Sequence, residues 1–92
     1  MRYTWDPEKD ALNRRKDGLS LEEGIPALLD PNFEFWIDDR LDYGEERIVT
    51  LGMGENQILV VVSAEREADT TRIISVRHAN GKETDWYYFG RP

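Results

Sequence analysis

The chain has 92 residues, no cysteine and a formal net charge of −7. This length supports one domain with a core but not a large cofactor cleft, and the missing thiols exclude disulfides, zinc–thiolate sites and iron–sulfur clusters. The longest apolar run, residues 58–62, is far too short to cross a bilayer, and the N-terminus has no signal-peptide core. We therefore expect a single soluble domain over residues 1–92, in the cytoplasm and without membrane contact.

The first predicted elements are a short strand and a helix. Residues 1–5 alternate loosely, as a short strand does. A helix follows over about Pro7 to Asp17, because Asp6 is a good N-cap, proline suits the first turn, and Gly18 can end the helix in the left-handed conformation. Lys9, Asn13 and Lys16 share one face of this helix. That face either binds phosphate or is simply solvated.

Charge is segregated along the chain. Residues 2–16 hold five cations against three acids, residues 22–46 hold nine acids and one cation, and residues 66–82 hold four cations against two acids. If the fold brings the two basic segments together, a basic patch forms on an acidic protein.

A second helix is predicted over residues 20–29. Ser20 and Glu23 form a capping box ahead of four aliphatic residues that share a helical face. Pro26 lies inside this segment, where it removes a hydrogen bond, so we expect the helix to start late, to kink or to be partly 3₁₀.

Four strands follow, over residues 33–38, 47–53, 57–65 and 71–79. In the first, Phe33, Phe35 and Ile37 alternate with polar residues, which places Trp36 on the outer face. The third is apolar on both faces and is expected at the centre of the sheet. In the last, Arg72 and Arg77 point to opposite faces unless a bulge lies between them.

The C-terminal segment 80–89 is predicted as a short helix or a hairpin, and the capping pair Asn80 and Glu83 favours the helix. Its aromatic run either covers the core or binds a partner, with Trp36, Trp86 and Tyr87 as candidate partner anchors. Together the elements predict an α+β domain: two N-terminal helices on an antiparallel sheet of about four strands, and a C-terminal helix or hairpin.

Spaced motifs over almost the whole chain carry a family resemblance. They are Trp5-Asp6-Pro7-x-Lys9-x-x-x-Asn13-x-x-Lys16-x-Gly18-x-Ser20-x-Glu22-Glu23, Asp30-Pro31, Gly44-Glu45-x-Arg47, Thr50-x-Gly52, the run 59–62, and Arg72-Ile73-Ile74-Ser75-x-Arg77-x-Ala79 with Glu83. This set resembles the BrnT family of toxins from bacterial type II toxin–antitoxin pairs.

The resemblance implies a RelE-like fold and a ribonuclease activity that inhibits translation. It also implies neutralisation by a BrnA-like antitoxin that carries a ribbon-helix-helix segment. The pair would bind operator DNA only through the antitoxin and repress its own operon.

Metal-independent RNA cleavage by the 2′-hydroxyl needs aligned groups that take a proton and stabilise a crowded phosphorane. Arg77 is the first candidate for the phosphate clamp, since a guanidinium donates in pairs. The other candidates are Arg66 or Arg72 to share the clamp, Glu65 or Glu83 to accept the proton, and Lys9, Asn13, Lys16 and Arg72 to bind the RNA.

Other chemistry finds little support in the sequence. His78 is the only histidine and has no second histidine to pair with. Asp38, Asp39 and Asp42 lack the glycine and glutamate of a calcium loop, so they are interpreted as a solvated turn. We expect no metal site and no cofactor.

Three departures from the family pattern keep a second hypothesis open. Asp17 stands where family members commonly have histidine, and residues 80–85 carry one cation and two acids where the family is basic. Pro26 interrupts a helix that the family usually builds from good helix formers. A catalytically weakened member would act as a non-enzymatic antitoxin-binding module and co-repressor. A ribonuclease needs Lys9, Lys16, Arg66 and Arg77 to converge free of carboxylates, whereas a binding module needs only an apolar groove or edge. A third hypothesis, an acidic mimic of nucleic acid, rests on residues 22–46.

Overall fold

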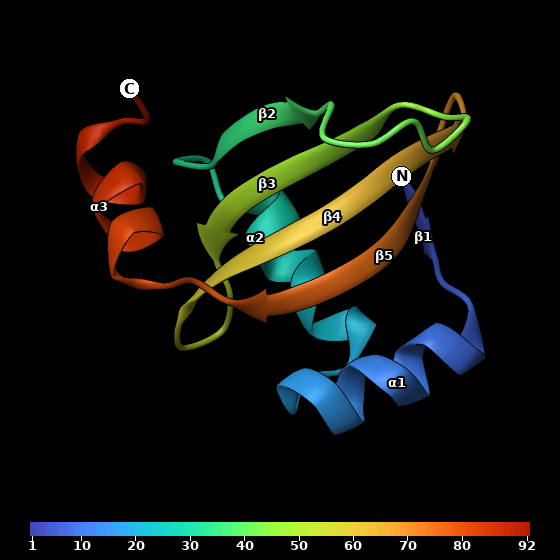
Figure 1. Cartoon of the computed structure of the whole chain (residues 1–92). Helices are drawn as coiled ribbons and strands as arrows, with labels where there is room; N and C mark the ends of the chain where they lie inside the picture. Colours follow the sequence, from blue (N-terminus) through green and yellow to red (C-terminus); the bar gives the residue numbers. More distant parts are fainter.

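The computed structural model describes all 92 residues, as three α-helices, one 3₁₀ turn and five strands (Figure 1). In chain order these are β1 (Arg2–Thr4), α1 (Pro7–Asp17), η1 (Leu21–Gly24), α2 (Ile25–Leu29), β2 (Glu34–Asp38), β3 (Arg47–Met53), β4 (Ile58–Glu67), β5 (Thr70–His78) and α3 (Gly81–Phe89).

The five strands form one mixed sheet in the order β1-β5-β4-β3-β2. Neighbouring strands from β2 to β5 are antiparallel, whereas β1 runs parallel to β5, with Arg2 opposite Thr70. The short first strand is confirmed, and so is an antiparallel sheet of four strands, β2 to β5. The prediction did not include β1 in that sheet as a fifth strand, parallel to β5. Alternation reveals a strand without revealing its partner, and this partner lies far along the chain.

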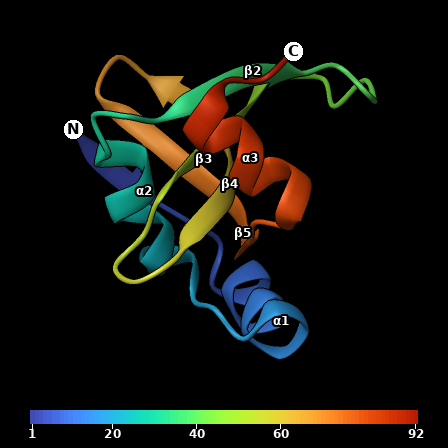
Figure 2. The same ribbon diagram turned by 90° about the vertical axis from the view of Figure 1, so that its left-hand side faces the viewer.

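Helices cover both faces of the sheet. Figure 2 shows α2 and α3 on opposite sides of the strands, with α1 beside β5. One core cluster, which includes Leu21, Val61 and Val76, lies under η1 and α2, and a second, which includes Leu51 and Val60, lies under α3. We call these surfaces the α2 face and the α3 face. The prediction that β4 is central is confirmed, since its middle residues are buried on both faces.

Local signals explain the helix boundaries. Asp6 accepts the Glu8 N–H at 2.9 Å, and Gly18 ends α1 with φ +72°. The Ser20–Glu23 capping box is present, and Pro26 divides the second predicted helix into η1 and the short α2 that starts beside it. Asn80 and Glu83 form a second capping box, so the C-terminal segment is a helix, not a hairpin.

The predicted orientation of β2 is wrong. Phe33, Phe35 and Ile37 are 44%, 55% and 44% exposed, whereas Trp36 is half-buried and Asp38 is buried. Alternation separates the two faces of a strand but does not say which one is covered. Here α3 covers the α3 face of β2, and it does so with Trp86, which packs against Trp36.

A bulge in β5 places its functional residues on one face. Arg72, Ser75 and Arg77 pair with Ala64, Val62 and Val60 of β4, and the register shifts between Val62 and Ser63. The three β4 residues are two apart, so all three β5 side chains lie on the α3 face. The sequence required a bulge for Arg72 and Arg77 to share a face, and the structure has it.

Candidate functional site

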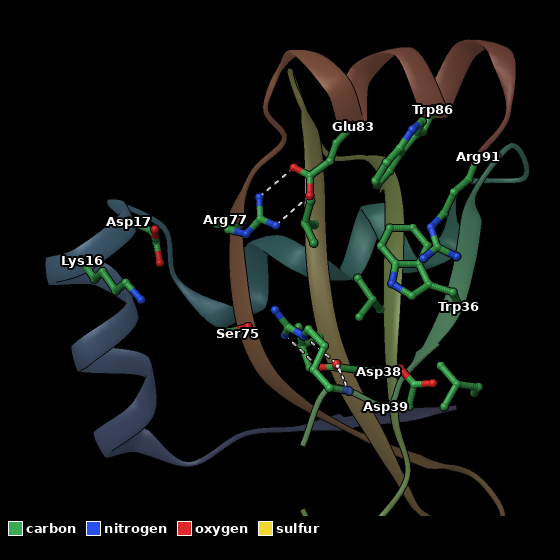
Figure 3. A pocket seen from close by; sticks show the side chains of 15 residues that line it. Lys16, Asp17, Trp36, Asp38, Asp39, Ser75, Arg77, Glu83, Trp86 and Arg91 are labelled. Atoms are coloured by element: carbon green, nitrogen blue, oxygen red, sulfur yellow. Dashed lines mark hydrogen bonds and ion pairs between the residues drawn. The ribbon is translucent and has the colours of Figure 1, made fainter. Parts of the chain in front are cut away.

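A pocket of about 400 Å³ opens on the α3 face, between the start of α3, the segment after β2 and the end of α1 (Figure 3). Its floor is Val49, Val60, Val62 and Ser75 of the central strands. Its walls carry Lys16, Asp17, Trp36, Asp38, Asp39, Arg40, Arg77, Glu83, Trp86 and Arg91. An apolar floor with converging charged and aromatic walls is typical of a ligand site.

Arg77 is held by a paired contact with Glu83. Its Nη1 lies 2.8 Å from Oε1 and its Nη2 2.7 Å from Oε2. Glu83 also accepts the Asn80 N–H at 3.0 Å, so the first turn of α3 fixes the carboxylate. The hydrogen bonds between the two side chains raise the pKa of Arg77 and lower that of Glu83. Both groups are therefore charged at neutral pH, and the guanidinium has one orientation.

Asp38 forms a second paired contact, with Arg40. Arg40 Nε lies 2.8 Å from Oδ1 and Nη2 2.9 Å from Oδ2, and Tyr43 donates to Oδ2 at 3.2 Å. The hydrogen bond from Arg40 is the main cause that lowers the pKa of Asp38 to about 2. The interpretation of Asp38 as part of a solvated turn is wrong. Asp38 lies two residues after Trp36 on the same face of β2, and this face is the covered one. Asp39 and Asp42 are exposed, as expected.

Two indoles and a guanidinium form the wall opposite Arg77. The Trp36 and Trp86 rings meet edge to face, with centroids 5.8 Å apart. Arg91 stacks over Trp36 at 4.3 Å and lies 5.6 Å from the Trp86 ring (Figure 3). Such a wall suits a nucleobase, which stacks on aromatic and guanidinium planes.

Tyr87, the third predicted partner anchor, lies outside this pocket. Its hydroxyl donates to Asp30, which also accepts the Met53 N–H at 2.8 Å. The bond to Asp30 raises the pKa of Tyr87 to about 12. Tyr87 therefore ties α3 to the end of α2 and the end of β3.

The lysines of α1 border a second hollow beside the pocket. Lys9, Leu12, Lys16, Asp17, Ile74 and Ser75 are among its lining residues. Lys16, Asp17 and Ser75 also line the main pocket, so the two hollows adjoin. The structure thus brings Lys9, Lys16, Arg77 and Glu83 together along one path.

Three other residues considered in the sequence do not line the main pocket. Asn13 borders the second hollow but is buried, and its side-chain amide donates to the Leu19 and Val76 carbonyls and accepts the Val76 N–H. Glu65 pairs with Thr71 in a register that places it on the α2 face. His78 lines a hollow beside Leu19 on that same face.

Arg66 and Arg72 do lie on the α3 face, but at the far end of the strands. Both contact Glu45, and so does Arg47. This group is separate from the pocket lining around Arg77.

The sequence did not suggest Arg40 or Arg91, nor Ser75 and Asp17, as site residues. Had the face of β2 that carries Trp36 and Asp38 been predicted as the covered one, the buried Asp38 would have pointed to Arg40, two residues on. Arg91 follows the end of α3 and has no local signal.

Comparison with known proteins settles the family. Residues 5–83 match the sequence model of the ribonuclease toxin BrnT of type II toxin–antitoxin systems. The chain belongs to the BrnT family. The resemblance inferred from its motifs is therefore confirmed, and the family implies an antitoxin partner. The search of curated proteins found no match.

A BrnT toxin of known structure has the same fold. The crystal structure of the Brucella abortus ribonuclease toxin BrnT matches with a TM-score of 0.60 and 21% identity, over 87% of this chain and 97% of that one. The α+β class is confirmed, and the RelE-like description gives way to the more specific BrnT fold. No helix of this BrnT-family chain is both long and apolar enough to span a membrane. It also has no group of three or more His, Cys, Asp or Glu placed to hold a metal ion.

Proposed function

We propose that this chain is a ribonuclease toxin that cleaves RNA in the pocket under α3, with Arg77 as the phosphate clamp. The observation that carries the proposal is the fixed fork of Arg77 at the mouth of an apolar-floored pocket, opposite two indoles and beside the α1 lysines. Trp36, Trp86 and Arg91 would stack the base, and Lys9 and Lys16 would hold the flanking backbone.

The reaction we propose needs no metal. The 2′-oxygen attacks the adjacent phosphorus as a base takes its proton, the phosphorane forms, and the 5′-oxygen leaves with a proton from an acid. The products are a 2′,3′-cyclic phosphate and a 5′-hydroxyl. The Arg77 guanidinium is preorganised to stabilise the charge that develops on the phosphorane oxygens.

Glu83 is better suited to position Arg77 than to accept the proton. Its lowered pKa makes it a weak base, and both of its oxygens face the guanidinium. Asp17 and Asp39 carry the pocket carboxylates that no hydrogen bond or ion pair engages. Asp17, next to Lys16 and where the resemblance expects histidine, is our candidate for the proton acceptor. Glu65 has no role here, because it lies on the other face.

The biological setting follows from the family. We propose that the toxin acts in the cytoplasm, inhibits translation, and is neutralised by a BrnA-like ribbon-helix-helix antitoxin through which the pair binds its operator. Trp36 and Trp86 remain the proposed anchors, so the antitoxin would close the same pocket that binds RNA.

One observation favours the second candidate, a non-enzymatic antitoxin-binding module. The pocket lining holds four cations, Lys16, Arg40, Arg77 and Arg91, and four acids, Asp17, Asp38, Asp39 and Glu83. Its charges balance, and Arg77 is not free of carboxylates. A site of this kind binds a polyanion less strongly than an unpaired basic patch does.

Cleavage of a structured cellular RNA by the antitoxin-free protein in excess chelator tests the proposal. We expect Arg77→Ala to lower the rate about a hundredfold or more, the usual effect of removing one preorganised donor. Arg77→Lys should restore little, because an ammonium cannot reproduce the fork. Arg15→Ala, an exposed residue of α1, is the matched control.

The outcomes separate the two candidates. Cleavage that persists in Arg77→Ala would move the active site away from this pocket. No cleavage by folded wild type, together with tight binding of an antitoxin, would establish the binding module. Cleavage that requires added divalent metal would overturn the metal-independent mechanism alone.

A further inference from the structure

A group of three arginines surrounds one carboxylate at the end of the α3 face away from Arg77. Glu45 is contacted by Arg72 Nη2 at 2.6 Å, Arg66 Nη1 at 3.3 Å and Arg47 Nε at 3.4 Å. The other arginine ion pairs in the molecule, Arg14–Asp10, Arg40–Asp38 and Arg77–Glu83, join one cation to one acid. Around Glu45 cations therefore exceed anions, in a protein whose formal net charge is −7.

No second acid balances this group. Asp38 pairs with Arg47 across β2 and β3, but both of its oxygens are engaged by Arg40 and Tyr43. One carboxylate is thus shared by three guanidinium groups, which together carry many more donors than two oxygens can accept.

Arg72 has one of the donors that the Glu45 carboxylate does not satisfy. Its Nε is buried and has no hydrogen-bond partner, although its Nη2 is bound to Glu45. An unsatisfied buried donor on a charged group is costly and calls for an explanation. A phosphate, with more acceptor oxygens in a tetrahedral arrangement, can engage a guanidinium fork through two donors at once.

Glu45 lies in a segment that can move, so that another anion can replace its carboxylate between the arginines. It belongs to the segment 39–46 between β2 and β3, outside both strands, so moving it breaks no strand pairing (Figure 1). The backbones of Arg47, Arg66 and Arg72, by contrast, belong to strands β3, β4 and β5 of the sheet.

The group also lies in line with the proposed active site. Arg72 and Arg77 share the α3 face, and their β4 partners, Ala64 and Val60, are four residues apart. That separation is roughly 13 Å along the strand, a span that a short single strand of RNA can cover.

We propose that Arg47, Arg66 and Arg72 form a phosphate-binding site that the Glu45 carboxylate occupies in the free protein and an RNA backbone phosphate takes over. The proposal rests on the ribonuclease function above, for which it supplies a second backbone contact beyond the clamp at Arg77. Glu45 acts as an internal competitor that sets how readily RNA engages this end of the sheet.

The test uses an uncleavable probe. A short fluorescent oligodeoxythymidine lacks the 2′-hydroxyl, so fluorescence anisotropy measures binding without any cleavage. Glu45→Gln keeps the size of the side chain and removes the competing charge, and we expect about tenfold tighter binding. Glu46→Gln is the matched control, since it removes the same charge from an exposed neighbour, and we expect a change of about twofold or less.

A third variant tests whether the tighter binding expected for Glu45→Gln depends on the arginines. Adding Arg66→Ala to Glu45→Gln should reverse most of the gain, because the phosphate loses one of its cations. Equal effects of Glu45→Gln and Glu46→Gln, or weaker binding by Glu45→Gln, would overturn the proposal and leave the group as a structural ion-pair network.

A further measurement uses the wild-type protein alone and therefore does not require any variant to fold. Titration with inorganic phosphate, followed through arginine Nε–Hε resonances, should move the Arg72 signal as its orphaned donor gains an acceptor. A stationary Arg72 signal would contradict the proposal. These readouts are independent of RNA cleavage, so the phosphate site can fail while the function at Arg77 stands, and the reverse.

Discussion

Asp38 shows how one buried carboxylate organises the pocket wall. Its side chain is only 2% exposed, whereas that of its partner Arg40 is 76% exposed. The carboxylate therefore fixes an otherwise free arginine beside the pocket. Because its pKa falls from 3.8 to about 2 in the folded protein, this contact stabilises the fold only while Asp38 is ionised.

The sign of the pH dependence follows from that lowered pKa. The stabilisation by Asp38 is complete above its unfolded pKa of 3.8 and is lost as the pH falls through about 2. We expect Asp38→Asn to lack this part of the acid sensitivity. Over that interval the wild-type free energy of unfolding should fall by about 1 kcal/mol more than that of the variant, allowing for solvent screening at Arg40.

Urea unfolding at a series of pH values measures the difference. Asp39→Asn, an exposed neighbour, is the control and should follow the wild type. Parallel pH curves for wild type and Asp38→Asn would show that the paired contact does not form in solution.

At the scale of elements, Asn13 completes the edge of β5. β1 pairs with β5 only over Thr70 to Arg72, so the edge beyond is left open. The Asn13 amide donates to the Val76 carbonyl at 2.8 Å and accepts the Val76 N–H at 3.1 Å. The Asn13 side-chain amide thus makes the two hydrogen bonds that a neighbouring strand would make with Val76, and it connects α1 to the sheet.

Asn13→Ala should cost stability rather than remove an RNA contact. It leaves the Val76 N–H and carbonyl and the Leu19 carbonyl without this partner, and we expect a loss of about 2–4 kcal/mol. Chemical denaturation gives the magnitude, and faster hydrogen exchange at the Val76 amide gives the location. Arg15→Ala should stay within about 0.5 kcal/mol of wild type. Unchanged stability with weakened RNA binding would instead place Asn13 in the RNA site.

The sequence predicted where helices and strands lie better than it predicted which elements pack against one another. Caps and breakers such as Asp6, Gly18 and Pro26 act within one turn, so they located the helices correctly. The exposed side of β2 and the parallel pairing of β1 depend on residues far away in the chain. Local alternation carries no information about either.

The same limit applies to the site. Arg77, Glu83, Lys9 and Lys16 were candidates and share one path, because strands and helices of known period carry them. Arg40 and Arg91 lie in irregular segments, where no period places a side chain. The sequence shows that Arg72 and Arg77 can share a face only if β5 has a bulge between them. The position of that bulge is set by the pairing of β5 with β4.

At the scale of the whole molecule, an acidic protein presents the proposed RNA contacts on one face. The net charge of −7 makes diffuse attraction to a polyanion unfavourable. Binding should therefore depend on a few defined contacts and not on the general surface.

Salt dependence tests this view. For single strands the slope of log K against log salt is about −0.7 for each phosphate neutralised. With the uncleavable oligodeoxythymidine we expect Arg77→Ala to reduce the magnitude of the slope by about 0.7. Lys82→Ala, a cation outside the pocket lining, should leave the slope unchanged. A slope that Arg77→Ala does not alter would mean that Arg77 contacts no phosphate.

The pairing of β1 with β5 has a kinetic consequence. Arg2 meets Thr70, and Asn13 meets Val76 across 63 residues of chain. β1 and α1 therefore lack β5, the strand against which both of them lie, until the end of the chain is in place, and closing so long a loop slows folding. A chain in which β5 has not yet formed leaves β1 and α1 without that cover and open to proteases, so cleavage competes with the completion of folding.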